Sequence, residues 1–425
     1  MNKKGLQIFL AGFFFFLLSA CETQNGTAGK ELNSMEEPIT LEIRNPKVEI
    51  STQFEQMVRA YEKENPGVKI NVRTVGGAAD DLTDLKAQIA AGEGPDIFTN
   101  GGYEQAKLWS NYLEDLSDQP WVENVYEGAL EPMTIGEGIY GMPVNVEGYG
   151  FIYNKDLFEQ VGIETLPKTL TELIETAESL EAAGITPFAT GYYEDWKLSD
   201  HLMGSAFARQ DDPDAFIAGL NDGSQTIENN ETFKGLIQLL DVTLEFGNDD
   251  PLTTDYHTEV TLFANGEAAM IQQGNWIQPL IDQLAPNMNI GFLPIPVNDS
   301  PKNDVLAVDV PNYWVVNQKS TPQKKQEAKK FLNWMVSTEE GQKFITEQFK
   351  FIPAFKHIEA NDLGPLAEDV MWYVKADKTL SFHWFKHPEG TRDEFGFAIQ
   401  AYVGNQLNRD QLLQELQKSW ERAAR

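Results

Sequence analysis

Strand-like and helix-like hydrophobic patterns alternate along this chain from residue 39 onward, and this alternation limits the folds open to it. Apolar and polar residues alternate over residues 39–43 and again over 68–72, as in half-buried strands. Between them, residues 52–64 place apolar side chains on one face of a helix. A second helical pattern over 80–91 leads into a short apolar run at 95–98. This order of strands and helices predicts an α/β fold, with a parallel sheet flanked by helices on both faces.

Helix start signals recur farther along the chain. Thr52 and Thr169 each precede a glutamate by three residues, which is the spacing of a capping box at a helix N-terminus. Further helices are expected from Pro322 and around Trp420 near the C-terminal end. The chain has no internal repeat with a period of roughly 20–50 residues, which excludes a solenoid. The roughly 400 residues beyond the N-terminal segment are enough for two domains.

The N-terminal segment has the features of a removable signal. Lys3 and Lys4 precede an apolar run over residues 6–18. A bilayer-spanning helix needs about 20 apolar residues, so this run predicts a signal peptide over residues 1–20 and not a permanent anchor. Residues 18–21 (LSAC) resemble a bacterial lipobox, and this resemblance implies that Cys21 carries a diacylglyceryl group and becomes the new N-terminus. An ordinary secretory signal followed by a chance cysteine is the alternative.

The composition fits an exported chain and argues against a nucleic acid partner. Cys21 is the only cysteine, so no disulfide can form within the chain and apolar cores must supply the stability. Residues 21–38 are polar and are expected to form a flexible tether. The formal net charge of −32 repels phosphate backbones, so no nucleic acid partner is expected.

Three segments, in a fixed order, carry a recognisable pattern. The first runs from residues 138–143 (GIYGMP) to 153–158 (YNKDLF). The second is 263–270 (FANGEAAM), followed by 274–276 (GNW). The third is 314–344, where a strand precedes a helix. Together with the lipobox, they resemble the bacterial extracellular solute-binding proteins of ABC importers, in the branch that binds sugars, over nearly all of the chain after residue 39.

The resemblance implies a two-lobe, hinged fold of the type II periplasmic-binding-protein class, in which each lobe has a mainly parallel sheet. The expected first lobe comprises residues 39–146 and 307–352, and the second comprises 147–306 and 353–425. The resemblance also implies that the chain captures a carbohydrate between the lobes and delivers it to the membrane subunits of an ABC permease. A monomer without cofactor or enzymatic activity is expected. Lipid on Cys21 is expected to hold it at the extracellular face of the cell membrane, either at the outer surface of a Gram-positive-type cell or in the periplasm.

Candidate ligand-binding residues follow from the chemistry of sugars. A sugar presents hydroxyl groups at its edge and flatter C–H faces, so its site needs aromatic planes and planar polar side chains. The aromatic residues of the 190–196 loop and the residue Trp276 suit that need. The resemblance implies that Trp276 stacks on a sugar ring and that Glu147, on a hinge strand, accepts hydroxyl protons. The expected ligand-binding residues are Trp276, Glu147, Trp196, Tyr193, Asn100, Tyr103 and Asp309.

Two further groups of residues each have two interpretations. Either Lys47 or Glu49 is expected to be a further contact in the first lobe. Residues 382–393, with Phe382, Trp384, Arg392 and Asp393, either extend the cleft or form a packed crossover. The number of aromatic residues favours an oligosaccharide over a monosaccharide, because several planes can serve several rings.

Two other functions remain as alternatives. A membrane-anchored glycosidase also holds sugars, but it needs two carboxylates about 5–5.5 Å apart for retaining chemistry, and the many acidic residues make such a pair uninformative. A metal-ion receptor is suggested by the i,i+4 spacing of His383 and His387 and by the adjacent Tyr192 and Tyr193. Pro388 makes a continuing helix at His387 unfavourable, and five histidines offer few ligands.

Overall fold

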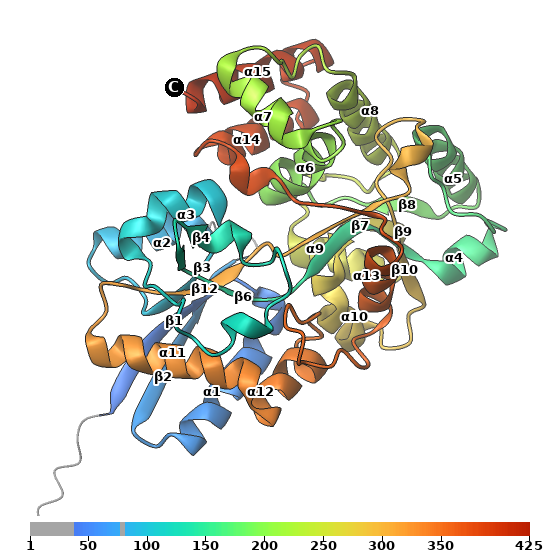
Figure 1. Cartoon of the computed structure of the whole chain (residues 1–425). Helices are drawn as coiled ribbons and strands as arrows, with labels where there is room; N and C mark the ends of the chain where they lie inside the picture. The colour runs from blue at the N-terminus through green and yellow to red at the C-terminus, as the bar shows by residue number, and fades with distance from the viewer. Residues whose placement is uncertain (1–37, 77–80) are drawn as a thin grey trace, which may run out of the picture. The chain divides into compact units, whose positions relative to one another are not determined.

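The computed structural model describes residues 38–76 and 81–425. The expected signal peptide (1–20), the lipidation site Cys21 and nearly all of the tether lie outside the described residues. Within the described ranges, no helix combines the length and the apolar character needed to cross a membrane. The described residues form two lobes, each with its own sheet and its own hydrophobic core (Figure 1).

The first lobe, at the lower left of Figure 1, has a sheet between two layers of helices. Its strands, in spatial order, are β2 (Val68–Thr74), β1 (Ile39–Asn45), β3 (Ile97–Asn100), β12 (Tyr313–Val316) and β6 (Met142–Pro143). Helices α2 (Asp81–Ala90) and α3 (Tyr103–Trp109) lie on one side of this sheet. On the other side lie α1 (Ser51–Glu64), α11 (Pro322–Ser337) and α12 (Glu339–Lys343). A short hairpin joins β4 (Thr134–Ile135) to β5 (Gly138–Ile139).

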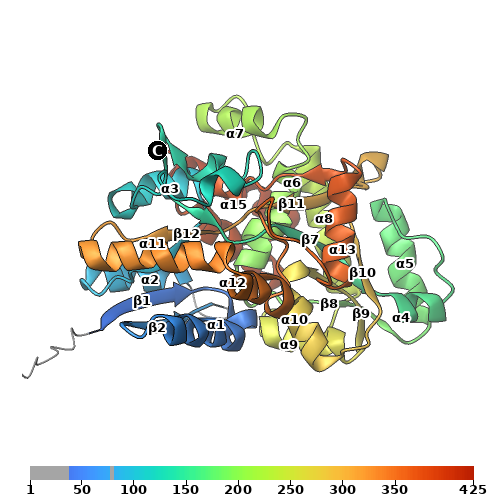
Figure 2. The ribbon, with the colours of Figure 1, turned by 60° about the horizontal axis from the view of Figure 1, so that its bottom comes forward.

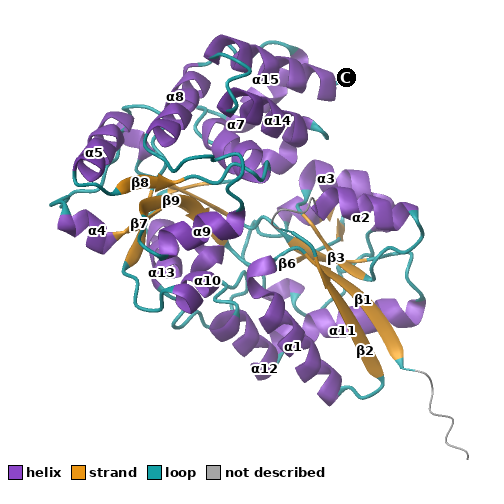
Figure 3. Ribbon diagram, turned by 180° about the vertical axis from the view of Figure 1, so that it is seen from behind, coloured by secondary structure: helices purple, strands orange, loops and turns teal. Residues whose placement is uncertain are grey.

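The second lobe repeats this layered arrangement around a longer strand. Its sheet has the order β13 (Thr379–Leu380), β11 (Leu306–Asp309), β7 (Glu147–Asn154), β9 (Ala268–Gly274) and β8 (Thr186–Ala189), and β10 (Ile290–Leu293) pairs with β7. On one side lie α6 (Met203–Phe207), α7 (Pro213–Asp222), α8 (Glu231–Glu245), α14 (Thr391–Val403) and α15 (Arg409–Ala423) (Figures 1 and 3). On the other side lie α9 (Tyr256–Ala264), α10 (Gln278–Leu284) and α13 (Pro365–Lys375). Figure 2 shows α4 (Lys155–Gln160) and α5 (Leu170–Ala182) at the outer edge of this lobe.

Both sheets are mixed, which corrects the expectation of mainly parallel sheets. β1 runs parallel to β2 and β3, but β12 runs antiparallel to β3 and β6. In the second sheet, β7 runs antiparallel to β9, β10 and β11. Parallel neighbours are joined through crossover helices, whereas β7 and β12 each enter their sheet directly from the other lobe. The predicted two-lobe α/β fold is confirmed, because each sheet carries a separate core.

Within the described residues, the chain passes between the lobes three times. The passages lie between β6 and β7, between β11 and β12, and between Ile358 of the first core and Leu363 of the second. The first two passages are hydrogen-bonded to each other, since the Val144 amide donates to the Asn312 carbonyl at 2.9 Å. The Val146 amide donates to the Ile352 carbonyl at 2.8 Å, so the segment that leads toward the third passage is also bonded to the first. These segments together form the hinge region.

The lobe boundaries differ slightly from the expected ones. The expected boundary at residue 307 falls inside β11, which pairs with β7 in the second sheet. The passage to the first lobe therefore follows Asp309. After residue 352, the side chains of Ala354, Phe355 and Ile358 still belong to the first core.

The two capping boxes have different outcomes. At Thr169 the box is present: the side chain accepts from the Glu172 amide at 3.2 Å, and the Glu172 carboxylate accepts from the Thr169 amide at 3.0 Å. At Thr52 the prediction is wrong, because a short 3-10 helix over Val48–Ile50 leads directly into α1 at Ser51. Thr52 therefore lies inside the helix and not at its cap.

Candidate functional site

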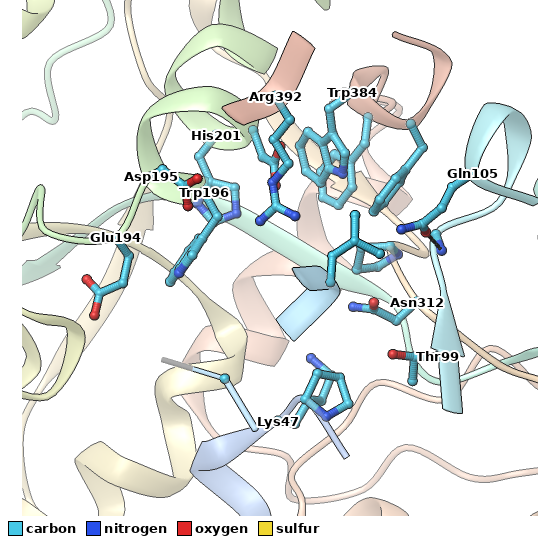
Figure 4. Close-up of a pocket in the computed structure, with 18 of the residues that line it drawn as sticks. Lys47, Thr99, Gln105, Glu194, Asp195, Trp196, His201, Asn312, Trp384 and Arg392 are labelled. Carbon is cyan, nitrogen blue, oxygen red and sulfur yellow. Dashed lines mark hydrogen bonds and ion pairs between the residues drawn. The ribbon is translucent and has the colours of Figure 1, made fainter. Parts of the chain in front are cut away.

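A cavity of about 480 Å³ lies between the lobes and is lined by both of them. Figure 4 shows Thr99, Gln105 and Asn312 on one side of it and Trp196 and His201 on the other. Lys47 closes it at one end, and Arg392 points into its middle beside Trp384 (Figure 4). The first lobe presents the ends of β1 and β3, because the carboxyl ends of parallel strands meet at one edge of a sheet. The second lobe presents the 193–201 segment, the residues after β9 and the 382–400 segment.

Aromatic rings form much of the second-lobe wall. The His201 imidazole packs between other rings, 4.5 Å from Tyr149, 5.1 Å from Trp276 and 5.7 Å from Trp384, measured between ring centroids. Trp196 meets the Trp276 ring edge-on at 6.4 Å. Because these rings come from separate elements and contact one another, each limits the movement of the next. The wall is therefore preorganised to receive an apolar face.

Trp276 is fixed by two residues shortly before it in the sequence, Gly274 and Gln273. A Cβ atom on Gly274 would come within 2.0 Å of the Trp276 ring, so the indole lies directly over the glycine. The indole N–H donates to the side-chain oxygen of Gln273 at 3.0 Å. The Gly-x-Trp spacing thus has a physical reason: any larger residue at 274 would displace the ring from the cavity wall.

Two carboxylates and one ammonium group meet where the hinge borders the first lobe. Lys47 and Glu147 form a buried ion pair, and Glu49 lies 3.7 Å from the Lys47 ammonium group. Asn145 donates to the Glu147 carboxylate at 3.2 Å. Burial acts to lower the pKa of Lys47, but Glu147 and Glu49 outweigh it and raise that pKa. Burial raises the pKa of Glu49, and Lys47 opposes the shift in part.

A second ionic contact lies beside the aromatic wall. The Arg392 guanidinium is 3.1 Å from the Asp200 carboxylate. Burial raises the pKa of Asp200 to about 6, although Arg392 opposes this shift. Burial, with Lys197 and Arg392 nearby, lowers the pKa of His201 to about 3, so the imidazole is neutral at physiological pH. Its Nδ1 atom has no hydrogen-bond partner among the residues that the structure describes.

Five of the seven candidate residues line the cavity: Trp276, Glu147, Trp196, Asn100 and Tyr193. Tyr103 and Asp309 are absent from its described lining, and their role as ligand contacts stays a prediction. Asp309 instead accepts from the backbone amides of Val310 at 2.8 Å and Phe382 at 3.0 Å, so it holds the 382–385 segment in place. The Tyr103 ring is covered by the Lys386 ammonium group at 4.9 Å.

The residues for which the sequence allows two interpretations line the cavity. Lys47 and Glu49 both contribute to its wall. Phe382, Trp384, Arg392 and Asp393 do so as well, as expected if this stretch extends the cleft.

Several lining residues were not anticipated from the sequence. His201 was not singled out, although it follows the aromatic 190–196 loop closely. Phe397, on α14, was not anticipated either; it is 63 % exposed and lines the cavity, as does the predicted residue Tyr193, which is 48 % exposed. Gln400 ties them together, because its amide donates to the carbonyl of Tyr193 at 2.9 Å and its own helix carries Phe397. An exposed phenylalanine in a helix gives no sequence signal for this role, since single exposed apolar residues are common.

Two α/β lobes, joined by hydrogen-bonded hinge segments and sharing a cavity, define the class of hinged two-lobe binding proteins. Comparison with known families specifies the class further. The family model described as "Bacterial extracellular solute-binding protein" matches residues 45–342, well over half of the 425 residues. The chain belongs to this family.

Relatives of known name include two sugar-binding proteins. The multiple sugar-binding protein of Streptococcus mutans (serotype c, strain UA159) is 23% identical over 404 residues, covering 93% of this chain and 92% of that protein. The galactooligosaccharide-binding protein of Bacillus subtilis (strain 168) is 27% identical over 376 residues, covering 85% of this chain and 83% of that protein.

Solved structures show the same fold. A chitin oligosaccharide binding protein matches with a TM-score of 0.80 at 21% identity, covering 92% of this chain and all (100%) of that one. The solute-binding protein RafE in complex with raffinose matches with a TM-score of 0.78 at 23% identity, covering 91% of this chain and 100% of that one.

Proposed function

We propose that this protein captures an uncharged oligosaccharide in the cavity between its lobes and delivers it to an ABC permease, without converting it chemically. The observation that carries the proposal is the cavity wall, in which indole rings from three separate segments stand beside carboxylates and amides. Stacking on such rings matches the C–H faces of a sugar, and the polar groups match its hydroxyls. The names of the relatives support the same class of ligand.

The charges around the cavity favour a neutral ligand. Among the described residues, the carboxylates that line it are Glu49, Glu147, Glu194, Asp195, Asp200 and Asp393, and the cations are Lys47 and Arg392. Both cations lie within ion-pair distance of carboxylates. Carboxylates accept hydrogen bonds from sugar hydroxyls but repel an acidic sugar. Uronic acids and sugar phosphates are therefore disfavoured ligands.

The test of the proposed function is titration calorimetry with a panel of neutral α- and β-linked oligosaccharides, together with a uronic acid oligomer. We expect saturable binding of at least one neutral member, no binding of the acidic oligomer, and no cleavage products after prolonged incubation. Absence of binding across the panel contradicts the proposal. Release of shorter sugars would instead indicate the glycosidase alternative.

Exposed rings at the cavity predict that ligand length matters. Phe397 and Tyr193 extend the aromatic surface from the buried wall toward solvent. We expect Phe397→Ala to weaken the binding of a tetrasaccharide about fivefold, because one stacking contact is worth roughly 1 kcal/mol. Binding of the matching disaccharide is expected to stay within twofold of the wild type. Calorimetry with both sugars measures the difference.

A matched control for this prediction is Trp372 on α13. Its ring is 55 % exposed and is not among the described residues that line the cavity. Trp372→Ala is therefore expected to leave the affinity for both sugars unchanged. Equal loss of both sugars in Phe397→Ala, or no loss of either, argues against a ligand that reaches Phe397.

Delivery follows from closure of the hinge. A sugar that contacts both lobes stabilises the closed arrangement over the open one, and the hinge segments absorb the change. Membership in an extracellular family supports a location outside the cytoplasmic membrane. Lipid on Cys21 would keep the receptor close to its permease by raising the effective concentration. Mass spectrometry of the membrane fraction, compared with Cys21→Ala, tests the anchor.

A further inference from the structure

A buried polar cluster of the second lobe lies next to the aromatic wall, and of its members only Glu194 is in the described lining of the cavity. Lys197, Glu259 and Gln273 are 2%, 1% and 0% exposed, respectively. The Lys197 ammonium group lies 3.1 Å from the Glu259 carboxylate and 3.3 Å from that of Glu194. Glu259 and Gln273 are absent from the described lining of the cavity, so they do not reach a ligand held there. A buried charge in a lobe core is costly unless it has partners, and here each group has several.

Glu259 joins two separate parts of the ligand-facing wall. One of its carboxylate oxygens accepts from the Gly191 amide at 2.9 Å, at the start of the loop that carries Tyr193 and Trp196. The other accepts from the Gln273 side-chain amide at 2.7 Å and from Lys197. The 190–196 loop and the end of β9 are thus both hydrogen-bonded to the Glu259 carboxylate.

Gln273 connects Glu259 to Trp276 through its side-chain amide. Its NH₂ group donates to Glu259, so its oxygen faces the other way and accepts from the Trp276 indole N–H at 3.0 Å. The partners leave one orientation of the amide, since the carboxylate only accepts and the indole only donates. The indole N–H is thereby used within the protein, and Trp276 offers a ligand its ring face.

We propose that Gln273 and Glu259 are positioning residues that set the orientation of the Trp276 ring and its spacing from Trp196, and so determine affinity without touching the ligand. This inference deepens the proposed function and rests on it. Gln273 acts directly on the indole N–H. Glu259 acts through Gln273 and through the loop at Gly191, so the two residues affect the same ring from one buried point.

The test compares Gln273→Leu with the wild type by two measurements on the full protein. The first is the indole N–H signal of Trp276 in a ¹⁵N–¹H spectrum, assigned by its loss in Trp276→Phe. The second is calorimetric affinity for the neutral oligosaccharide that binds the wild type best. We expect the indole signal to shift and its hydrogen exchange to accelerate, and the affinity to fall about tenfold, because the ring loses its fixed orientation.

Glu327→Gln is the matched control. Glu327 is a buried carboxylate of the other lobe that accepts from the Tyr61 hydroxyl at 2.6 Å, and it is not in the described lining of the cavity. Glu327→Gln is expected to lower the unfolding temperature while leaving the Trp276 signal and the oligosaccharide affinity unchanged. If Gln273→Leu does not fold, Glu259→Gln is measured in the same way, with the same two changes expected.

Two results overturn the inference. One is a folded Gln273→Leu or Glu259→Gln variant with an unchanged Trp276 signal. The other is a shifted signal with affinity within twofold of the wild type. The spectrum needs no ligand, so it separates this inference from the proposed function: a wild type that binds no sugar contradicts the function, while the indole signal still reports whether Gln273 positions the ring.

Discussion

Trp276→Ala is expected to weaken oligosaccharide binding by about 30- to 1000-fold. Buried aromatic anchors at the centre of a binding surface typically cost about 2–4 kcal/mol on truncation, which corresponds to that range. Trp276 fits this description because its ring meets Trp196 and His201 within the cavity wall. Its removal also leaves the Gln273 oxygen without the indole donor. Titration calorimetry with the best neutral ligand measures the change.

The control for this prediction is Trp334, a buried tryptophan of the first lobe. Its indole donates to Glu64 at 2.9 Å and its ring packs on Tyr61, away from the cavity. Trp334→Ala is expected to lower the unfolding temperature with no change in affinity. If a folded Trp276→Ala variant binds the sugar as tightly as the wild type, the site has been placed wrongly.

Acid is expected to destabilise the protein through its buried neutral histidines. Burial lowers the pKa of both His201 and His387 to about 3. Between that value and the ordinary pKa of 6.5, the unfolded chain binds more protons than the folded protein does, so stability rises with pH and is lost as pH falls. At pH 4.5 each histidine contributes a loss of about 2–3 kcal/mol relative to pH 7.5. Asp200, with its pKa raised to about 6, acts in the opposite direction between its ordinary pKa and that value.

His387→Phe isolates one of these terms. The His387 ring lies 4.2 Å from Phe207 and 5.2 Å from Trp420 between centroids, in an aromatic environment that accepts a phenyl ring. Urea denaturation at pH 7.5 and pH 4.5 is expected to show a free-energy loss that is about 2–3 kcal/mol smaller in the variant than in the wild type. His257, exposed on α9, serves as the control, and His257→Gln is expected to keep the wild-type difference. Equal losses in His387→Phe and the wild type contradict this account of acid sensitivity.

Local patterns predicted the parts of the site that depend on neighbouring residues. Trp276 follows Gly274, and the structure shows why this spacing puts the ring on the wall. The aromatic 190–196 loop likewise brings Trp196 to the cavity. The helices and strands around them followed from hydrophobic periodicity, which reports which face of an element is buried.

The remaining parts depend on contacts between distant residues, which a single sequence does not encode locally. Lys47 and Glu147 are separated by 100 positions and meet only through the hinge. Asp309 ends β11, next to the passage between the lobes, but its carboxylate accepts hydrogen bonds from two backbone amides. Phe397 lines the cavity because α14 lies beside the 190–196 loop. The side-chain amide of Gln400, on the same helix, donates a hydrogen bond to a carbonyl of that loop. The mixed strand directions also depend on distant parts of the chain, because β7 and β12 each enter their sheet from the opposite lobe and run antiparallel to a neighbour.

A crystal structure of the protein with its tightest-binding neutral oligosaccharide tests the central claim most directly. The account predicts a sugar enclosed between the two lobes, with one ring face against the Trp276 indole and hydroxyl groups bonded to carboxylates such as Glu147. A sugar bound outside this cavity, or one that contacts neither Trp276 nor Glu147, contradicts it.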